Sequence, residues 1–228
     1  MRQTYLLYDE RMELHRDISC REEDTTSDEY YESFENPRRI ACIYKKLEVL
    51  ETKLRSRQLE TDLNDTSNVK TTLSMNNNPF KHPFPRLECY PAKKSTIQLA
   101  HSSRYYERLK ETSNMSQADL ERLYTIDFTQ EEESNDRDLY FCNDTFLAAS
   151  LACGGVVNCV NAVTNPIMGD DDNNMVTRAI ALVRPPGHHA CQESAMGKIL
   201  YFTFSYHWLH VDMALEMHSR IRRILFFQ

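Results

Sequence analysis

A short run of apolar residues, Ala179-Ile180-Ala181-Leu182-Val183, limits the folds open to this chain more than any other feature. A continuous apolar run of this length is typical of a strand that is buried on both faces in a parallel sheet. The residues that follow are Arg184-Pro185-Pro186-Gly187-His188-His189-Ala190. The two prolines stop the strand and stiffen the turn. We therefore expect the histidine pair at the carboxyl edge of the sheet, where such folds carry their functional residues.

Strand patterns and helix patterns alternate along the rest of the chain. Thr4–Tyr8 and Leu139–Phe141 are short, apolar and aromatic, and each predicts a strand. Helices are predicted from Asn36, over 96–112, from Ser116, and from Asp144 to about Val163. Because strands and helices alternate, the sequence predicts an α/β layered fold.

The helix that begins near Asn36 has the clearest signals. Asn36 is a good N-cap, and Pro37 fits the first helical position because its missing N–H needs no partner there. One apolar stripe follows, formed by Ile40, Ile43, Tyr44, Leu47, Leu50 and Leu54. Each buried member stabilises the fold by roughly 1.5–3 kcal/mol, so the helix must pack on another element. Residues 55–94 are rich in Asn, Ser, Thr and Pro and predict a long loop or insertion.

Composition restricts the class of protein. A chain of 228 residues, 41% of them hydrophobic, is long enough for one domain with a core. Its net charge of −7 gives it no electrostatic reason to bind nucleic acid directly. The seven cysteines form no C-x-x-C pair, which favours reduced thiols in an intracellular protein. We find no apolar run of the roughly 18 residues that span a bilayer, and therefore expect no membrane contact.

The adjacent histidines His188 and His189 are the candidate chemical groups. Imidazole titrates near neutral pH, so one ring of a pair can take a proton from water while the other stabilises developing charge. A histidine pair taken alone more often belongs to a surface loop or a fortuitous metal contact. The complete heptad after a buried strand favours a functional site instead.

The heptad Arg184–Ala190 resembles the hallmark motif of the histone deacetylases. Other segments are similar to the class II branch of that family in the same order along the chain, and the resemblance covers about Thr4 to Gly197. These segments are Tyr8–His15, Glu35–Ile40, Ala100–Ser102, Tyr140–Phe146 and Cys153–Gly155. The resemblance implies the arginase-like α/β fold, a parallel sheet flanked by helices, with 1–197 as the N-terminal part of the catalytic domain.

The resemblance also implies an activity and the residues that perform it. Histone deacetylases use a zinc-bound water to hydrolyse the amide of acetyl-lysine, so zinc is the implied cofactor. By position in the motif, His189 is the general base and His188 is its electrostatic partner. Arg39 matches the arginine that lines the channel beneath the active site. The acidic residue at the pocket rim falls near 136–138, where Arg137 takes the expected place, so no residue is assigned to it.

Partners and setting follow from the same resemblance. The implied partners are acetylated histone tails or other proteins that carry acetyl-lysine, together with subunits of a co-repressor complex. The implied role is chromatin repression in the nucleus, with the cytoplasm as a second location. A non-catalytic interaction module of a deacetylase complex is the alternative function.

The resemblance ends at Gly197. In the family a tunnel-lining Phe and an apolar helix follow, whereas 198–228 here form a tail without family motifs. The family's zinc ligands are an Asp-x-His and a later Asp, and no Asp-x-His occurs among the 228 residues. We therefore expect a truncated catalytic domain, incomplete at its C-terminus and inactive by itself. The tail contains His207, His210 and Asp212, but their surroundings favour a surface segment over a metal site.

Overall fold

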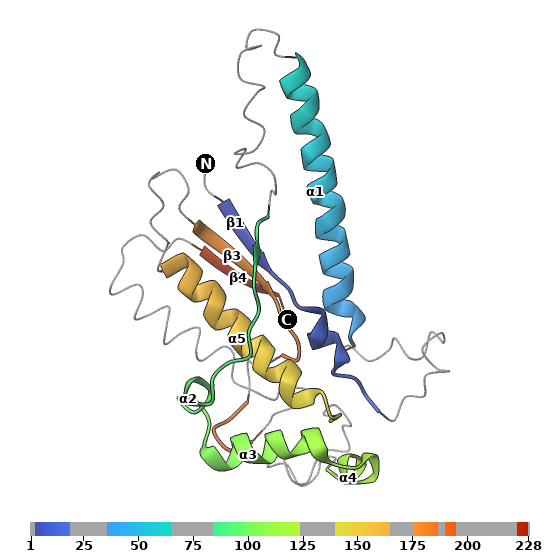
Figure 1. Ribbon diagram of the computed structural model, residues 1–228, viewed down its shortest axis with the longest axis vertical. Coiled ribbons are helices and arrows are strands. Elements are labelled where there is room, and N and C mark those ends of the chain that lie inside the picture. The colour runs from blue at the N-terminus through green and yellow to red at the C-terminus, as the bar shows by residue number, and fades with distance from the viewer. Residues whose placement is uncertain are drawn as a thin grey trace.

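The computed structural model describes residues 3–18, 36–64, 84–123, 140–164, 176–186, 190–194 and 223–227. Its centre is a four-stranded sheet in the order β2-β1-β3-β4, in which all neighbouring strands are parallel. The strands are β1 (Gln3–Leu7), β2 (Arg86–Leu87), β3 (Val176–Leu182) and β4 (Arg223–Phe227) (Figure 1). This parallel sheet with flanking helices confirms the predicted α/β fold class.

The two apolar strands β1 and β3 form the centre of the sheet, as their sequences require. Leu6 pairs with Ile180, and Leu7 pairs with Ala181. Leu6 and Leu7 are both fully buried although successive side chains of a strand point to opposite faces. The sheet is therefore covered on both sides here. The strands predicted from Thr4 and from Ala179 are confirmed, with small differences at their ends.

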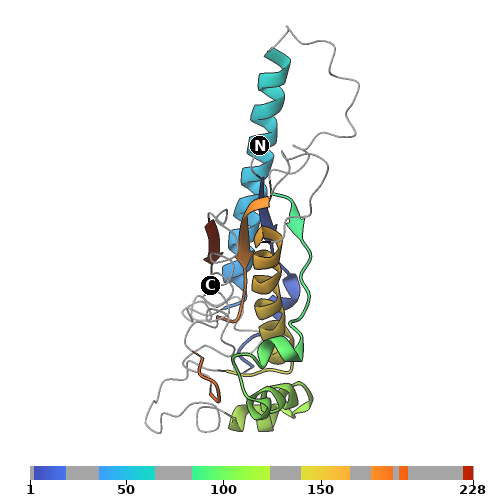
Figure 2. The same ribbon diagram turned by 90° about the vertical axis from the view of Figure 1, so that its left-hand side faces the viewer.

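Helix α5 (Thr145–Thr164) lies against this sheet along most of its length (Figures 1 and 2). Its start agrees with the helix predicted after Asp144, whose backbone carbonyl accepts a hydrogen bond from the N–H of Ala148. By length and composition α5 could cross a membrane, which the sequence analysis did not anticipate. Within the protein, however, 67% of its apolar window is buried. In this fold α5 serves as the core helix of an α/β layer.

Glycine in α5 permits a close crossing of another segment. A Cβ atom added to Gly154 would lie 1.9 Å from the carbonyl oxygen of Tyr90 and 2.7 Å from the backbone nitrogen of Ala92. The N–H of Ala92 donates to the carbonyl oxygen of Ser150 at 2.8 Å. The segment around Pro91 can therefore cross α5 only because residue 154 has no side chain.

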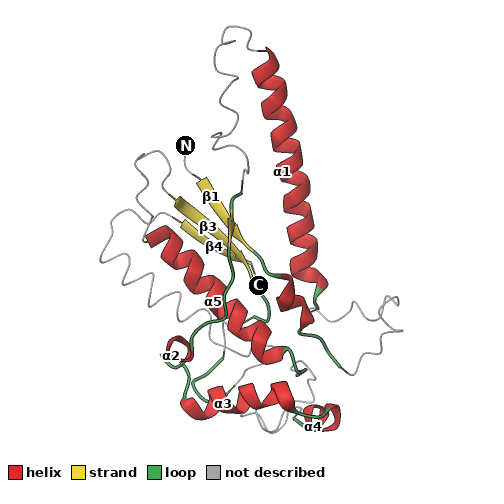
Figure 3. Ribbon diagram, viewed as in Figure 1, coloured by secondary structure: helices red, strands yellow, loops and turns green. Residues whose placement is uncertain are grey.

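Helix α1 (Arg38–Asn64) begins as predicted, because the side-chain oxygen of Asn36 accepts from the N–H of Arg38 at 3.1 Å. Ile40 is buried, and Ile43, Tyr44 and Leu47 pack against the same core. The helix continues through Asn64, although we predicted a loop over 55–94. The residues after Arg55 are mostly good helix formers, and no proline occurs between Arg55 and Pro79. Figure 3 shows α1 extending well past the strands.

A second buried cluster lies where three short helices meet α5. The helices are α2 (Lys94–Ile97), α3 (Ser103–Glu111) and α4 (Gln117–Arg122), with the short helix η6 (Thr112–Asn114) between the last two. Ser102 interrupts the single helix predicted over 96–112 because its side chain caps α3 by accepting from the N–H of Tyr105. Ser116 caps α4 in the same way through Asp119, as predicted.

Two further predictions about strands differ from the structure. Tyr140 and Phe141 are buried but form no strand, since the next residue, Cys142, donates its N–H to the Thr145 hydroxyl at the start of α5. Leu139 lies outside the described residues. β4 comes from the tail, where we expected no strand of the sheet, and it pairs with β3 from Arg178 to Leu182.

The cysteines agree with the interpretation as reduced core residues. Among the six described cysteines none forms a disulfide, and four of them are buried: Cys89, Cys142, Cys153 and Cys159. Cys42 and Cys191 are exposed. Burial raises the pKa of the Cys159 thiol to about 12, so this thiol is protonated at neutral pH.

Candidate functional site

Arg184, the first residue of the predicted catalytic heptad, is buried at the carboxyl end of β3. Only 1% of its surface is exposed. Its guanidinium donates to the backbone carbonyl of Met12 at 3.2 Å and to that of His15, and on its other side to the hydroxyl of Tyr140 at 2.5 Å. The planar fork of arginine matches several acceptors at once, which lysine cannot do. Arg184 thus ties the end of β3 to two segments that are distant in sequence.

The first of these segments is the helix η1 (Glu10–Leu14), which follows β1. Asp9 caps it by accepting from the N–H of Arg11 at 2.9 Å. A side-chain pair of Asp9 and Arg11 at 2.6 Å closes the same turn. The guanidinium of Arg11 also donates to the carbonyl of Cys89 at 3.2 Å. The chain therefore leaves β1 in a fixed direction toward Arg184.

His15 and Tyr140 complete the buried cluster around Arg184. Their rings are stacked with centroids 4.6 Å apart. His15 is 2% exposed, and its Nδ1 lies 3.0 Å from the Thr145 hydroxyl at the start of α5. Burial, together with the positive charge of Arg184, holds the pKa of His15 well below 6.5. His15 is consequently a neutral imidazole at physiological pH and acts here as a packed hydrogen-bonding group.

The segment after the histidine pair is held by a different motif. The N–H of Ser102 donates to the carbonyl of Gln192 at 3.1 Å, and its hydroxyl donates to the carboxylate of Glu193 at 2.7 Å. His101 is buried, and burial lowers its pKa although the backbone of Gln192 and Cys191 opposes that shift. Both ends of the heptad segment are therefore anchored, by the Arg184 cluster before it and by 101–102 after it.

Of the predicted site residues, the structure describes Arg39 only. Arg39 is half-buried in the first turn of α1, where its N–H donates to the carbonyl of Asn36 at 3.2 Å. His188, His189 and the acidic stretch 136–138 lie outside the described residues. Their roles stay predictions from the motif. Among the described residues, the structure brings together other segments of the motif set, namely 8–15, 100–102, 140–146, 184–186 and 190–194.

The described part of the chain contains no candidate metal site. No group of three His, Cys, Asp or Glu residues there is arranged to hold an ion. The nearest titratable groups of the cluster are poor candidates, since His15 uses Nδ1 toward Thr145 and is fully buried. His207, His210 and Asp212 lie outside the described residues.

Sequence reasoning treated Arg184 as part of a motif and missed its structural role. Its partners Met12, His15 and Tyr140 come from segments far away in the chain, so no local spacing could identify them. No local signal showed that Arg184 is buried, because arginine side chains are mostly exposed. Once it is buried, its guanidinium requires several acceptors.

Comparison with known proteins agrees with this arrangement. The sequence profile described as "Histone deacetylase domain" matches residues 33–225, which extends beyond Gly197, where the motifs end. The histone deacetylase HDA1 of Candida albicans is 31% identical over 199 residues, covering 87% of this chain and 19% of that protein. HDA1 of Saccharomyces cerevisiae is 30% identical, covering 87% of this chain and 23% of the relative. The chain thus spans about a fifth of the length of these relatives.

Two other similarities are more limited. The polyamine deacetylase HDAC10 of Danio rerio is 31% identical over 115 residues, 49% of this chain. The crystal structure of the HDA15 HD domain superposes with a TM-score of 0.57 at 22% identity, and it covers 94% of this chain and 44% of that one. At this identity the superposition supports the fold.

Proposed function

Because this chain belongs to the class II histone deacetylase family, we propose that its chemistry is hydrolysis of acetyl-lysine amides, with His189 as general base and His188 as electrostatic partner. The observation that carries the proposal is the heptad that begins at Arg184, placed directly after a central parallel strand. Described residues on both sides of the histidine pair are hydrogen-bonded to other segments, Arg184 to Met12 and Gln192 to Ser102. Anchored flanks of this kind suit a group that transfers protons, because proton transfer requires defined positions.

In this proposal each histidine has one task. His189 accepts a proton from the attacking water, and His188 stabilises the charge that develops on the reacting carbonyl. Arg39 lines the channel beneath the site. The neutral, buried His15 takes no part in proton transfer and instead supports the Arg184 cluster.

Zinc is the cofactor of the family, and the residues of this chain do not fit the family's site. The implied Asp-x-His is absent from the sequence. The described residues contain no other set of three metal-binding side chains. We therefore propose that the residues present here do not by themselves hydrolyse acetyl-lysine. In that proposal 1–197 carry the family motifs, and 198–228 carry none of them although β4 joins the sheet.

Substrate, partners and location are proposed on the strength of the relatives. Acetylated histone tails or other acetyl-lysine proteins are the proposed substrates, and co-repressor subunits are the proposed partners, in a nuclear role in chromatin repression. The names of the two HDA1 relatives support a histone substrate. Because one relative is named a polyamine deacetylase, acetylated polyamines are the second class of substrate to test beside acetyl-lysine peptides.

The first test uses the purified 228-residue chain. We expect negligible hydrolysis of an acetyl-lysine peptide or an acetylated polyamine, with and without added zinc, because the zinc ligands of the family are missing. Zinc content after dialysis is measured in the same samples. Robust turnover that a chelator abolishes would contradict the proposal and would make His207, His210 and Asp212 candidate ligands. If no turnover is found, a non-catalytic interaction module of a deacetylase complex is the alternative function that fits the chain.

The second test uses a version of the chain extended with the family's zinc-binding segment. Loss of a general base lowers kcat by about 10²–10⁴-fold, so His189→Ala is expected to abolish most turnover. His188→Ala is expected to lower kcat as well, and Lys110→Ala, a surface change on α3, is the control. An unchanged kcat in His189→Ala would show that another group is the base.

A further inference from the structure

The first turn of helix α3 receives part of its cap from a segment far along the chain. Ser102 is the N-cap, and its hydroxyl accepts from the N–H of Tyr105 at 3.1 Å. A capping box would place Glu or Gln three positions after the cap, where its side chain reaches back to the N–H of the cap residue. Tyr105 occupies that position here. The sequence of α3 therefore does not supply a capping box of its own.

Gln192 and Glu193 supply the acceptor and the carboxylate that a capping box would provide. The N–H of Ser102 donates to the carbonyl oxygen of Gln192 at 3.1 Å, and its hydroxyl donates to the carboxylate of Glu193 at 2.7 Å. The dipole of a helix also favours a carboxylate near its N-terminus. One serine hydroxyl thus accepts from α3 and donates to a residue 91 positions later. We call the contact of Ser102 with Gln192 and Glu193 the clamp.

The segment that the clamp holds has further contacts that fix its shape. The N–H of Cys191 donates to the carbonyl oxygen of Ser194 at 2.8 Å, which closes a turn. Ala190 and Ser194, at the two ends of the segment, are 1% and 7% exposed. The ring of His101, which is buried as well, interacts with the backbone of Cys191 and Gln192. These contacts hold the segment as one unit at the start of α3.

We propose that Ser102 and Glu193 are positioning residues for the histidine pair, an inference that rests on the proposed function of that pair. Ala190, the first residue of the held segment, is bonded directly to His189, and consecutive Cα atoms are about 3.8 Å apart. A backbone that is held at Ala190 therefore limits the positions open to His189. A proton-transfer group needs this restriction, because a displacement of about 1 Å can lower the rate about a hundredfold.

A helix cap alone does not require Glu193, as a comparison with α4 shows. Ser116 caps α4 in the same geometry, because its hydroxyl accepts from the N–H of Asp119 at 3.2 Å. The hydroxyl of Ser116 donates to the carboxylate of the same Asp119 at 2.6 Å. That cap is closed within one turn, whereas the cap at Ser102 uses a carboxylate from the segment next to the histidine pair. The contact with Glu193 thus joins two segments in addition to capping a helix.

The test records the NMR signals of the histidine rings in the 228-residue chain, so it requires neither metal nor turnover. Ser102→Asp keeps the cap of α3, since Asp caps helices as well as Ser does, but it cannot donate to Glu193 and repels it. We expect the ring signals of His189, assigned with His189→Asn, to shift by more than a line width. The backbone amide at position 102 should exchange roughly threefold faster or more, because its hydrogen bond to Gln192 is weakened.

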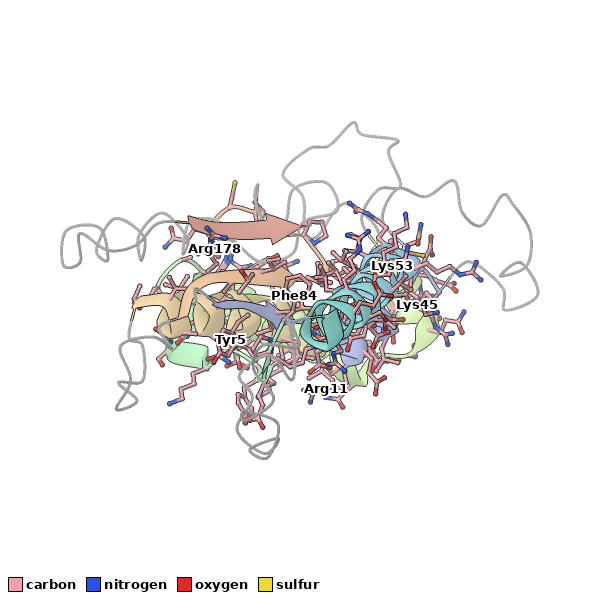
Figure 4. All side chains as sticks on the ribbon, turned by 90° about the horizontal axis from the view of Figure 1, so that it is seen from above. Tyr5, Arg11, Lys45, Lys53, Phe84 and Arg178 are labelled. Atoms are coloured by element: carbon pink, nitrogen blue, oxygen red, sulfur yellow. The ribbon has the colours of Figure 1, made fainter. Side chains whose placement is uncertain are left out.

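Further variants separate positioning from capping. Glu193→Ala breaks the clamp but leaves Ser102 in place, and it should shift the same ring signals. Ser102→Asp combined with Glu193→Lys restores a pair of opposite charges and should return the signals toward their original positions. Ser116→Ala removes the cap of α4 and should leave them unchanged. Lys53→Gln alters the net charge as much as Ser102→Asp does, at an exposed position of α1 (Figure 4), and should also leave them unchanged.

Each outcome decides the proposal. A shift in both clamp variants that the combined variant reverses supports it. No shift, a shift that persists in the combined variant, or an equal shift in Ser116→Ala overturns it. Thermal melts show whether each variant is folded, and if Ser102→Asp is not, Glu193→Ala compared with the controls decides. The kcat of His189→Ala tests the proposed function separately, so a histidine pair that is positioned but takes no part in hydrolysis would be recognised.

Discussion

Arg184 shows how one residue of a motif can determine the geometry around it. A buried guanidinium is costly unless its N–H groups are hydrogen-bonded, and here the carbonyls of Met12 and His15 and the hydroxyl of Tyr140 accept from it. The same contacts use backbone oxygens that would otherwise be buried with fewer donors. Arginine and its acceptors therefore stabilise one another, and neither is expected to tolerate loss of the other.

Replacing this arginine tests that argument. Arg184→Met keeps most of the buried volume but removes the donors to two carbonyls and a hydroxyl. We expect the free energy of unfolding to fall by about 3 kcal/mol, because each buried acceptor left without a donor costs about 1–3 kcal/mol. Arg184→Lys should recover only part of the loss. The exposed Arg178 of β3 is the control, and Arg178→Met should have little effect in urea titration. Equal losses in the two methionine variants would contradict the role of Arg184.

For single residues, the sequence predicted only those contacts that form between close neighbours in the chain. The cap at Asn36 was predictable, because a cap bonds to residues within the same turn. The Arg184 cluster was not, since its members are joined across up to 172 positions of the chain. The assignments of His188 and His189 rest on a motif, so they stay predictions until the two tests above are done.

Helices and strands were predictable where one residue pattern dominates the segment. They were less predictable where tertiary packing determines the local structure. β3 follows from its uninterrupted run of five apolar residues, whereas the two aromatic residues Tyr140 and Phe141 form no strand. The N–H of the next residue, Cys142, donates to the Thr145 hydroxyl at the start of α5. This hydrogen bond depends on where the helix begins. The division of 96–112 into α2 and α3 likewise follows from the cap at Ser102, which the helical spacing of apolar residues did not reveal.

The crossing of α5 by the segment at Pro91 gives a prediction at the scale of elements. A methyl group at Gly154 would overlap backbone atoms of Tyr90 and Ala92, which cannot move without breaking the hydrogen bond from Ala92 to Ser150. At Gly155 the nearest atom is a side-chain carbon of Leu7, at 2.7 Å. Overpacking in a core typically costs about 1–3 kcal/mol. We expect Gly154→Ala to lose at least the upper part of this range in urea titration, and Gly155→Ala to lose less.

A larger loss of stability in Gly155→Ala than in Gly154→Ala would show that the crossing segment moves aside more easily than the Leu7 side chain. Both substitutions raise helix propensity by about 1 kcal/mol, so that gain cancels in the comparison. The matched pair therefore measures the contact between α5 and the crossing segment rather than the stability of the helix alone.

Two buried histidines predict how the stability of the whole molecule depends on pH. Burial lowers the pKa of His15 and of His101 below the usual 6.5. The unfolded chain therefore binds more protons than the folded chain once the pH falls below about 6.5, so protonation favours unfolding. We expect the stabilisation to be fully present above this pH. The free energy of unfolding should then decrease as the pH falls from 7 to 5.

A variant separates this effect from other titrations. The pKa of Asp9 is lowered from 3.8, chiefly by its hydrogen bond to Arg11, so that carboxylate loses its stabilising pair only in more acidic solution. His15→Asn removes one titrating ring and keeps a polar side chain near the Thr145 hydroxyl. Its free energy of unfolding, measured in urea at each pH, should decline less steeply between pH 7 and 5 than that of the parent chain. If the two slopes agree, His15 is protonated equally easily in both states, and it is not the neutral, packed group that the structure places beside Arg184.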